Sequence, residues 1–466
     1  MLYSMFARTV HQFCQITDSR ISGELPSDAV INNAVIDSRQ ARKDTLFFAL
    51  QGARTHGIRF ADAARAAGAI VVADEQSAGD DSGPLIVAGD PGQALQQLAH
   101  VNRRQSDTLV AGVTGSVGKT TTRRLLATVL SSVRRGIQSP SSYNNELGVP
   151  LSLLQIQDDT EFAVIEMGAR HPGDIGHLCR IALPDLAVVT CVAPSHLTSF
   201  GSVAGIAATK RELVDSLGTS GTAFLNADDP CVLAMADSAH CQVITCGRSS
   251  NADRPFEVVD VSNTLLTVRM GRHTFSVPIC GEHHATGLAL SIAVAQELGL
   301  SPDEIQMGLD EFEPAPGRAV LRTIDGIEVI DDTYNASPVS VRAAIMMLNS
   351  WRTRGRRVLV LGDMLELGEQ AEDLHIETGA TIFGTEINHT LVCGRHAAHV
   401  AEGFLSTGGS PGRISVFDSV SSLLSVLDRL VDSGDVLLVK GSRGMGMERI
   451  VSGLRRSSAP HEQRAV

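Results

Sequence analysis

Short apolar runs alternate with longer stretches of helical periodicity along most of this 466-residue chain. In the central part, apolar runs beginning at residues 109, 162 and 186 each end in small or polar residues before a helical stretch begins. This order of strand, helix and strand is typical of a doubly wound parallel sheet, in which the carboxyl ends of the strands share one edge. The pattern therefore predicts an α/β protein.

The chain is too long for a single hydrophobic core, so we expect several domains. The first part of the chain holds two short alternating segments, at 34–39 and 45–50, before an alanine-rich helix and a further strand. The sequence Pro-Ala-Pro-Gly-Arg at 314–318 is typical of a linker. We predict three domains, with boundaries at 1–105, 106–315 and 316–466.

Beyond the linker, three apolar strands each lead into polar residues. The strand at 327–330 precedes Asp-Asp-Thr-Tyr-Asn-Ala-Ser-Pro, the strand at 358–361 precedes Gly-Asp-Met, and the strand at 436–439 precedes Lys-Gly-Ser-Arg. Parallel strands would bring these groups to one edge of a sheet. The pattern predicts a Rossmann-like C-terminal domain with a binding site along that edge.

The stretch 109–125 has the layout of a phosphate-binding loop, with an apolar strand, a glycine-rich turn and a helix. Gly115 and Gly118 have no Cβ, so the backbone can adopt left-handed angles and bring its N–H groups close to phosphate oxygens. The helix N-terminus and Lys119 add positive charge, and the Thr120 hydroxyl suits a Mg²⁺ ligand. The alternative is a glycine-rich turn with a solvated lysine, but the flanking strand and helix favour phosphate binding.

Two neighbouring strands direct further polar side chains to the same edge. Glu166 ends the strand that begins at 162, and His196 lies in the loop after the strand that begins at 186. Mg²⁺ prefers oxygen ligands, so Glu166 is a natural ligand and His196 a less usual one. We expect Thr120, Glu166 and His196 at the metal site. A helix-capping role for Glu166 and an ordinary loop position for His196 are the alternatives.

Charge and cysteine usage narrow the class of protein. The formal net charge of −13 argues against a surface that binds nucleic acid. Eight cysteines are scattered without Cys-x-x-Cys spacing, which favours reduced thiols over a disulfide framework or a zinc site. The N-terminus lacks the apolar core of a signal peptide, and no apolar run approaches a membrane span. We therefore expect a cytoplasmic protein without a nucleic-acid or membrane partner, and we expect it to be a monomer.

Taken in order, the motifs resemble those of the Mur ligases, over nearly all of residues 30–455. The segments at 331–336 and 362–368 separate the chain from most of the family and resemble the branch that adds a dipeptide. The resemblance rests on Gly115–Thr120, Tyr143–Pro150, Glu166–Gly168, His196–Leu197, Lys210, Asn226–Asp229, Gly317–Arg318, Asp331–Pro338 and Gly362–Gly368.

This resemblance implies an ATP-dependent amide ligase of peptidoglycan precursor synthesis, with Mg²⁺ as cofactor. The carboxylate of UDP-N-acetylmuramoyl-tripeptide would attack the γ-phosphate of ATP, and the amine of D-alanyl-D-alanine would displace phosphate from the acyl phosphate. Charge neutralisation would come from Lys119, from Arg318 and from Mg²⁺ on Thr120 and Glu166, with a second Mg²⁺ between Glu166 and His196. A C-terminal domain that closes on the linker would keep water from the acyl phosphate.

The resemblance also implies roles for individual residues. Lys210 matches a lysine that is carbamylated in these ligases, although a lone helix lysine is most often a solvated charge. The implied catalytic residues are Lys119, His196, Lys210 and Arg318. The implied ATP-binding residues are Gly115, Ser116, Val117, Gly118, Lys119, Thr120, Thr121, Asn226, Arg318, Asp332, Tyr334 and Asn335. The implied substrate-binding residues are Ser38, Arg39, Gly52, Arg54 and His56 in the first domain, Asn144 and Asn145 in the second, and Lys440, Ser442 and Arg443 in the third.

The chain departs from the family's pattern in two places. The family usually has His-Asn-x-x-Asn where this chain has His283, His284, Ala285, Thr286 and Gly287, so both asparagines associated with adenine are absent. Thr198 stands where an acid usually follows His-Leu, which removes a charge from the region of His196. Two other hypotheses therefore stay open at this point: a Mur-type ligase that adds a different amino acid, and a nucleotide-binding protein without catalysis.

Overall fold

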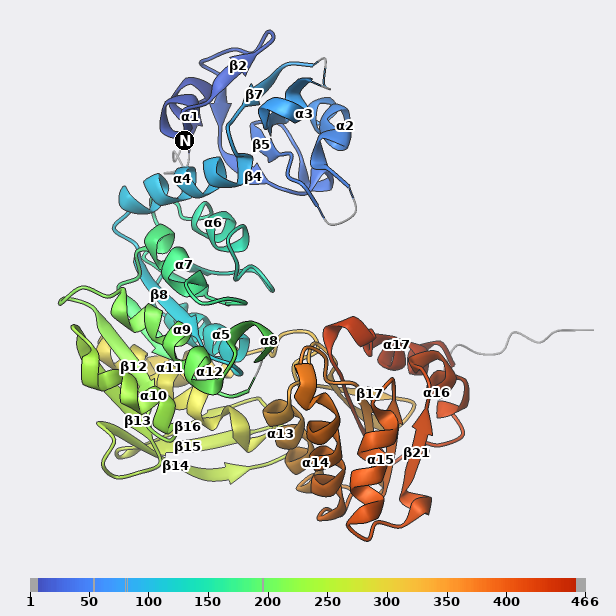
Figure 1. Cartoon of the computed structure of the whole chain (residues 1–466). Coiled ribbons are helices and arrows are strands. Elements are labelled where there is room, and N and C mark those ends of the chain that lie inside the picture. Colours follow the sequence, from blue (N-terminus) through green and yellow to red (C-terminus); the bar gives the residue numbers. More distant parts are fainter. Residues whose placement is uncertain (1–6, 53–54, 80, 82, 195–196, 458–466) are drawn as a thin grey trace, which may run out of the picture.

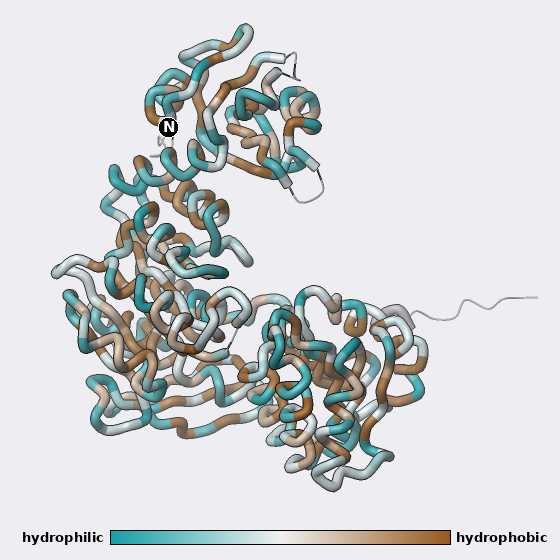
Figure 2. The backbone as a smooth tube through the Cα atoms, in the orientation of Figure 1, coloured by the Kyte–Doolittle hydropathy of each residue, from teal (hydrophilic) through white to brown (hydrophobic). Residues whose placement is uncertain are grey.

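The computed structural model describes residues 7–52, 55–79, 81, 83–194 and 197–457. Three α/β domains follow one another along the chain and form an open C shape, with the first and last domains extending from the middle one toward the same side (Figure 1). Hydrophobic segments concentrate inside each domain, and hydrophilic segments follow the loops and outer helices (Figure 2). The predicted α/β class with three domains is confirmed.

The N-terminal domain is built on a five-stranded sheet of order β2-β7-β6-β5-β4, in which only β2 is antiparallel to its neighbour. A small antiparallel pair, β1 and β3, lies beside it. The strands are β1 (Arg8–Thr9), β2 (Arg20–Ser22), β3 (Val30–Ile31), β4 (Asn33–Val35), β5 (Thr45–Phe48), β6 (Ile70–Ala73) and β7 (Leu85–Val87), and the helices are α1 (Val10–Thr17), α2 (Ala61–Ala66), α3 (Glu75–Gly79) and α4 (Pro91–Arg104).

Helix α4 joins this domain to the next. Proline begins the helix, and the Asp90 side chain accepts hydrogen bonds from two of its first amides. Its apolar face belongs to one continuous core that runs from Phe13 of α1, through Leu95 and Leu98, to the middle domain. Because burial of this face is shared by both domains, α4 is a rigid connection and not a free linker.

The middle domain carries a nine-stranded sheet of order β16-β15-β14-β13-β12-β11-β8-β10-β9. Strands β8 to β14 are parallel to their neighbours, whereas β14, β15 and β16 form an antiparallel extension that the strand–helix–strand pattern did not predict. The strands are β8 (Leu109–Thr114), β9 (Gly136–Gln138), β10 (Phe162–Glu166), β11 (Leu186–Val189), β12 (Thr222–Asn226), β13 (Gln242–Gly247), β14 (Arg254–Val261), β15 (Leu266–Met270) and β16 (His273–Val277).

Both faces of this sheet are covered by helices. Along β8, Val110 packs into the core shared with α7 and α9, and Ala111 packs into the opposite core with α5 and α11. The predicted doubly wound sheet is therefore confirmed. The helices are α5 (Lys119–Leu130), α6 (Gly148–Leu153), α7 (Asp174–Ala182), α8 (Leu197–Phe200), α9 (Val203–Asp215), α10 (Pro230–Leu233), α11 (Ala285–Glu297) and α12 (Pro302–Asp310).

The C-terminal domain has a six-stranded sheet of order β17-β18-β22-β19-β20-β21, parallel except at the β17 edge. One core under α13, α14 and α15 and a second under α16 and α17 cover its two faces. The strands are β17 (Val320–Ile324), β18 (Ile327–Asp332), β19 (Arg357–Gly362), β20 (His389–Cys393), β21 (Ile414–Phe417) and β22 (Val436–Lys440), and the helices are α13 (Pro338–Asn349), α14 (Ala371–Phe383), α15 (Ala397–Ser406), α16 (Val420–Leu427) and α17 (Glu448–Ser457).

The middle and C-terminal domains contact each other on both sides of the linker. The hydroxyls of Ser142 and Tyr334 are 2.7 Å apart. Farther along the boundary, the Asn263 side chain donates to the Arg352 carbonyl at 2.8 Å and accepts from its amide at 3.0 Å. These contacts place the carboxyl ends of β18, β19 and β22 beside the glycine-rich loop after β8.

Candidate functional site

A cavity of about 530 Å³ lies at the boundary between the middle and C-terminal domains. The glycine-rich loop and the start of α5 line it from the middle domain, and loops after β18, β19 and β22 line it from the C-terminal domain. Many of the predicted site residues meet here. They are Ser116, Val117, Gly118, Lys119, Thr120, Thr121, Asn226, Arg318, Asp332, Asn335, Lys440, Ser442 and Arg443.

The glycine-rich loop has the local geometry that its sequence predicts. Gly118 has φ of 85° and forms the N-cap of α5, where any side chain would be strained. Gly115 has φ of 149°, and a Cβ there would lie 2.0 Å from the Thr190 hydroxyl. These two glycines let the loop turn tightly under the helix N-terminus, which is the arrangement that binds phosphate.

Lys119 is folded back onto this loop. Its Nζ donates to the carbonyls of Gly115 at 2.7 Å and Ser116 at 3.2 Å. Burial lowers its pKa, and the nearby Arg318 adds to this effect, whereas Glu166 opposes it. An anion in the cavity would offer Lys119 a stronger partner than the neutral carbonyls, because a charge-assisted hydrogen bond is the stronger kind.

Thr120 and Glu166 form the oxygen pair expected for a metal site. The Thr120 hydroxyl donates to Glu166 Oε2 at 2.9 Å, and Asn144 Nδ2 donates to Oε1 at 2.9 Å. A hydroxyl and a carboxylate on adjacent elements fit the hard-oxygen preference of Mg²⁺. Within the described ranges, no cluster of three or more His, Cys, Asp or Glu side chains is arranged to hold a metal. Mg²⁺ here would take its other ligands from phosphate and water, which is its usual habit.

Arg123 is a site residue that the sequence did not reveal. It is 1% exposed, its Nε lies 3.9 Å from Glu166 Oε2, and its Nε and Nη1 have no hydrogen-bond partner. Burial lowers its pKa, and Glu166 opposes the shift. A buried guanidinium with unused donors increases the positive charge behind the phosphate loop. An arginine on a helix gives no sequence signal of this role, because most such arginines are solvated.

Lys210 does not line the cavity, but its charge interacts with that of Lys119, which does. Its side chain is on α9 and is 4% exposed. Burial lowers the pKa of Lys210 to about 7, and Lys119 contributes in the same direction. A large part of this amine is therefore neutral at physiological pH, which is the form that reacts with CO₂.

Arg318 and Tyr334 connect the linker to the C-terminal domain. The guanidinium carbon of Arg318 lies 4.1 Å from the centre of the Tyr334 ring, and that of Arg443 lies 5.7 Å from it. Arg318 Nε is buried without a partner. Arg318 and Arg443 both line the cavity and bring two guanidinium groups next to the phosphate loop, on a side that also carries Asp332 and Glu366.

The departures from the Mur pattern have structural explanations. At Gly287, a Cβ would lie 2.5 Å from the Thr122 hydroxyl and 3.6 Å from Thr122 Cβ, so Thr122 would have to rotate to admit the asparagine that is usual in the family. The His284 ring packs at a tilt of 44° against His283, with ring centroids 4.0 Å apart, and its Nε2 is buried without a partner. Both histidines line the cavity, and burial lowers the pKa of each, so both rings are neutral at pH 7.

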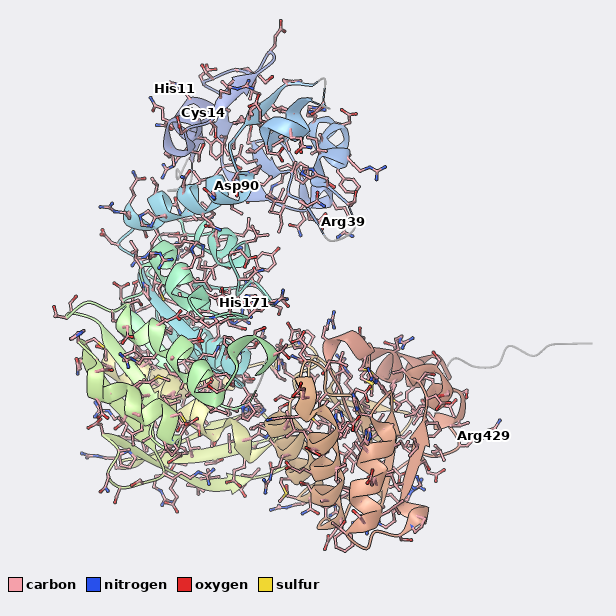
Figure 3. The ribbon with its side chains drawn as sticks, in the orientation of Figure 1. His11, Cys14, Arg39, Asp90, His171 and Arg429 are labelled. Atoms are coloured by element: carbon pink, nitrogen blue, oxygen red, sulfur yellow. The ribbon has the colours of Figure 1, made fainter. Side chains whose placement is uncertain are left out.

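The predicted residues of the N-terminal domain lie away from this cavity. Arg39 is on the side of its domain that faces the open C, as is His171 of the middle domain (Figure 3). The Arg39 guanidinium pairs with Asp37 at 2.6 Å, and Ser38 begins the same short 3₁₀ turn. His56 accepts a hydrogen bond from the Ile58 amide at 3.1 Å, and the Gly52 amide donates to Thr55. Two predicted residues, Arg54 and His196, lie outside the described residues.

The arrangement defines a class: a P-loop protein whose nucleotide site is completed by a second α/β domain. Comparison with known proteins narrows it further. Residues 30–101 match the Mur ligase family catalytic domain, residues 113–295 the Mur ligase middle domain, and residues 317–443 the Mur ligase glutamate ligase domain. The chain belongs to the Mur ligase family, and it is an ATP-dependent amide ligase.

Relatives and solved structures agree on one branch of this family. The chain is 34% identical to the UDP-N-acetylmuramoyl-tripeptide–D-alanyl-D-alanine ligase of Bacillus subtilis, covering 97% of this chain and 99% of the relative. It is 30% identical to the enzyme of the same name from Escherichia coli, with the same coverage. A crystal structure of MurF from Acinetobacter baumannii superposes with a TM-score of 0.87 at 28% identity, over 97% of this chain and 99% of that one. A MurF structure from Thermotoga maritima in complex with ADP has a TM-score of 0.78 at 28% identity, over 91% and 97%.

None of the helices in the described part of the chain is long and apolar enough to cross a membrane. All eight cysteines lie within the described residues and are free.

Proposed function

We propose that this chain joins D-alanyl-D-alanine to UDP-N-acetylmuramoyl-tripeptide, converting ATP to ADP and phosphate, as a cytoplasmic monomer. One observation supports this most directly. The phosphate loop shares its cavity with the two segments that resemble the dipeptide-adding branch, through Asp332 and Asn335 of the first and Leu365–Leu367 of the second. Relatives named for this reaction match the chain over nearly their whole length.

The reaction needs positive charge around the γ-phosphate and a dry cavity. A tripeptide carboxylate oxygen attacks the γ-phosphorus, and the bond from phosphorus to the leaving ADP oxygen breaks. The dipeptide amine then attacks the acyl carbon, loses a proton and releases phosphate. Lys119, Arg318 and Arg443, which all line the cavity, would stabilise the charge that develops on phosphate oxygens.

Thr120 and Glu166 would hold Mg²⁺, with His196 as the third predicted ligand. When bound, this ion would neutralise phosphate charge next to Lys119. Asn144 keeps the Glu166 carboxylate oriented toward Thr120 by its hydrogen bond to the other oxygen. Arg123 limits the net negative charge at the buried carboxylate.

Lys210 would be carbamylated, because its neutral amine can react with CO₂ to give an anion. Lys210 does not line the cavity, and its interaction with Lys119 supports an electrostatic role for the carbamate next to the phosphate loop. Ser38, Arg39, Gly52, Arg54 and His56 would bind the UDP part of the acceptor. The ion pair with Asp37 places the Arg39 guanidinium, which is 87% exposed, at the side of the domain that faces the other two.

Phosphate release measured with different substrate pairs tests the proposal. We expect release that requires both UDP-N-acetylmuramoyl-tripeptide and D-alanyl-D-alanine. Release with another amine only would show a ligase of different specificity, and ATP binding without release under any pairing would show a non-catalytic nucleotide-binding protein. Lys119→Ala is the control variant, and it should reduce turnover by at least about a hundredfold, because it removes a preorganised charge from the phosphate site.

A further inference from the structure

The loop after β19, Asp363–Gly368, forms part of the C-terminal wall of the cavity through Leu365, Glu366 and Leu367. Its backbone is irregular: Glu366 has φ of 65° and Gly368 has φ of 62°. An irregular segment holds one conformation only if other elements support it.

Two consecutive amides of this loop are held by side chains from other elements. The Met364 amide donates to His375 Nε2 at 3.0 Å, and the Leu365 amide donates to the Ser442 hydroxyl at 2.8 Å. The Asp363 carboxylate accepts from the amides of Arg395 at 2.7 Å and His396 at 2.9 Å, which fixes the start of the loop against α15.

His375 is the support whose ring can gain a second proton as the pH falls. It lies on α14, is 1% exposed, and its Nδ1 is 2.5 Å from the Ala371 carbonyl. A carbonyl can only accept, so Nδ1 carries the proton; a backbone amide can only donate, so Nε2 offers its lone pair. The two bonds together require the neutral ring with one defined tautomer.

We propose that neutral His375 is a positioning residue, which holds Leu365–Leu367 on the cavity wall by accepting the Met364 N–H and releases them when Nε2 is protonated. The expected effect on kinetics rests on the proposed ligase function. The support that His375 gives to the loop does not depend on that function. If Nε2 carried a proton, it would be a donor, and the Met364 N–H opposite it is also a donor. The hydrogen bond between them would be lost, and the loop would have one fewer hydrogen bond to other elements.

The surroundings of His375 set the direction of its pH response. Burial lowers its pKa from the ordinary value of 6.5; the bond to Ala371 opposes this, His396 lowers the pKa further, and Asp363 and His399 act in opposite directions. The His396 ring stacks on His375 at a centroid distance of 4.7 Å. Because the folded chain binds this proton less readily than the unfolded chain, the stabilisation is complete above pH 6.5 and is lost as the pH falls toward the lowered pKa.

Hydrogen exchange of the Met364 and Leu365 amides in the full chain tests the loop directly, without any assay of activity. We expect His375→Leu to increase exchange there and to lower kcat/KM for the amine by about tenfold, with ATP binding unchanged, because a misplaced wall affects orientation of the substrate. His375→Gln keeps a carbonyl acceptor that does not titrate. It should retain most of the protection and activity and show a weaker loss at acidic pH than the natural chain.

The matched control is His389→Gln in the same domain. His389 is half-buried, its Nε2 lies 3.0 Å from the Ser415 hydroxyl, and burial also lowers its pKa, but it does not line the cavity. The His389→Gln variant should leave hydrogen exchange of the Met364 amide unchanged. The proposal would be overturned if His375→Leu left the exchange of the Met364 and Leu365 amides and the kinetics unchanged. If that variant fails to fold, the deciding result is His375→Gln: exchange of these amides as fast as in an unprotected loop would overturn the proposal. An inactive natural chain that still shows the exchange pattern would refute the ligase function and leave the role of His375 standing.

Discussion

At the scale of single residues, burial decides which groups can do chemistry. Lys210 and Lys440 are both nearly inaccessible, at 4% and 2% exposed. Burial lowers the pKa of both amines, but at Lys440 the ion pair with Asp332 at 2.6 Å opposes this shift, whereas Lys119 adds to it at Lys210 and the pKa there falls to about 7. The charged partner favours the ammonium form at Lys440, and the neighbouring cation favours the neutral amine that carbamylation needs at Lys210.

The pKa of Lys210 gives a testable pH dependence. The neutral amine becomes more abundant as the pH rises through about 7, so we expect carbamylation and activity to increase over that interval and to fall when CO₂ is removed from the buffer. A ¹³C carbamate signal after incubation with labelled CO₂ measures the modification itself. Lys210→Ala should lose the signal and at least about tenfold in turnover, with partial rescue by short carboxylates.

The exposed Lys43 offers the control, because Lys43→Ala should change neither the signal nor the rescue. Full activity of Lys210→Ala, with no response to carboxylates, would return Lys210 to a purely structural role.

At the scale of elements, one arginine connects α4 to the middle domain. The Arg103 guanidinium donates to the carbonyls of Ser106 at 3.0 Å, Ala182 at 2.9 Å and Leu183 at 3.0 Å, and to Asp185 Oδ2 at 2.9 Å. The same Asp185 oxygen accepts from the Val110 amide at the start of β8. The Arg103 side chain therefore caps the C-terminal end of α7. Through Asp185 it also supports β8, the strand that leads to the phosphate loop.

Arg103→Met should lower the free energy of unfolding by about 3 kcal/mol, because it leaves the carbonyls of Ser106, Ala182 and Leu183 without this donor and Asp185 with the Val110 amide alone. Chemical denaturation followed by circular dichroism measures this loss. The neighbouring Arg104 is exposed on the same helix, and Arg104→Met is expected to change the unfolding free energy by less than about 0.5 kcal/mol. Equal effects of the two substitutions would show that the Arg103 contacts do not stabilise this junction.

At the scale of the whole molecule, the three domains form an open arrangement around a shared concave side (Figure 1). The residues proposed to bind UDP are on the first domain, and the phosphate cavity lies between the other two. The bonds between Ser142 and Tyr334 and between Asn263 and Arg352 already join the second and third domains. Because α4 joins the first two domains through a shared core, further closure would instead turn the C-terminal domain about the linker at 314–318, and these bonds would rearrange as it approaches the first domain.

We expect a smaller radius of gyration in small-angle X-ray scattering when an ATP analogue and UDP-N-acetylmuramoyl-tripeptide are added together. The bound acceptor would then contact the first domain through its UDP part and the phosphate cavity through its peptide. The acceptor alone should give a smaller change than the pair. Lys119→Ala, which weakens phosphate binding, is expected to compact less under the same conditions. No change in the natural chain, with both ligands shown to bind by calorimetry, would contradict closure.

Much of the fold and the phosphate loop could be predicted from the sequence. A strand followed by two glycines, a lysine and a helix is specified by neighbouring residues, and Gly115 and Gly118 adopt the expected loop angles. The placement of Glu166, Asp332 and Lys440 at the carboxyl ends of strands was also predicted, because the apolar runs before them are continuous, although the strands expected at 327–330 and 436–439 extend to Asp332 and Lys440. The proposed domain boundaries follow from the same local signals.

Only the tertiary structure decided the rest. Arg123 is a buried cation beside Glu166, Gly287 faces the Thr122 hydroxyl where α11 meets α5, and His375 supports a loop from another element. The antiparallel strands 254–277 likewise depend on pairing that periodicity does not reveal. Local geometry is determined by consecutive residues, whereas burial, pKa and hydrogen-bond partners depend on residues far apart in the chain, which meet only when the domains fold.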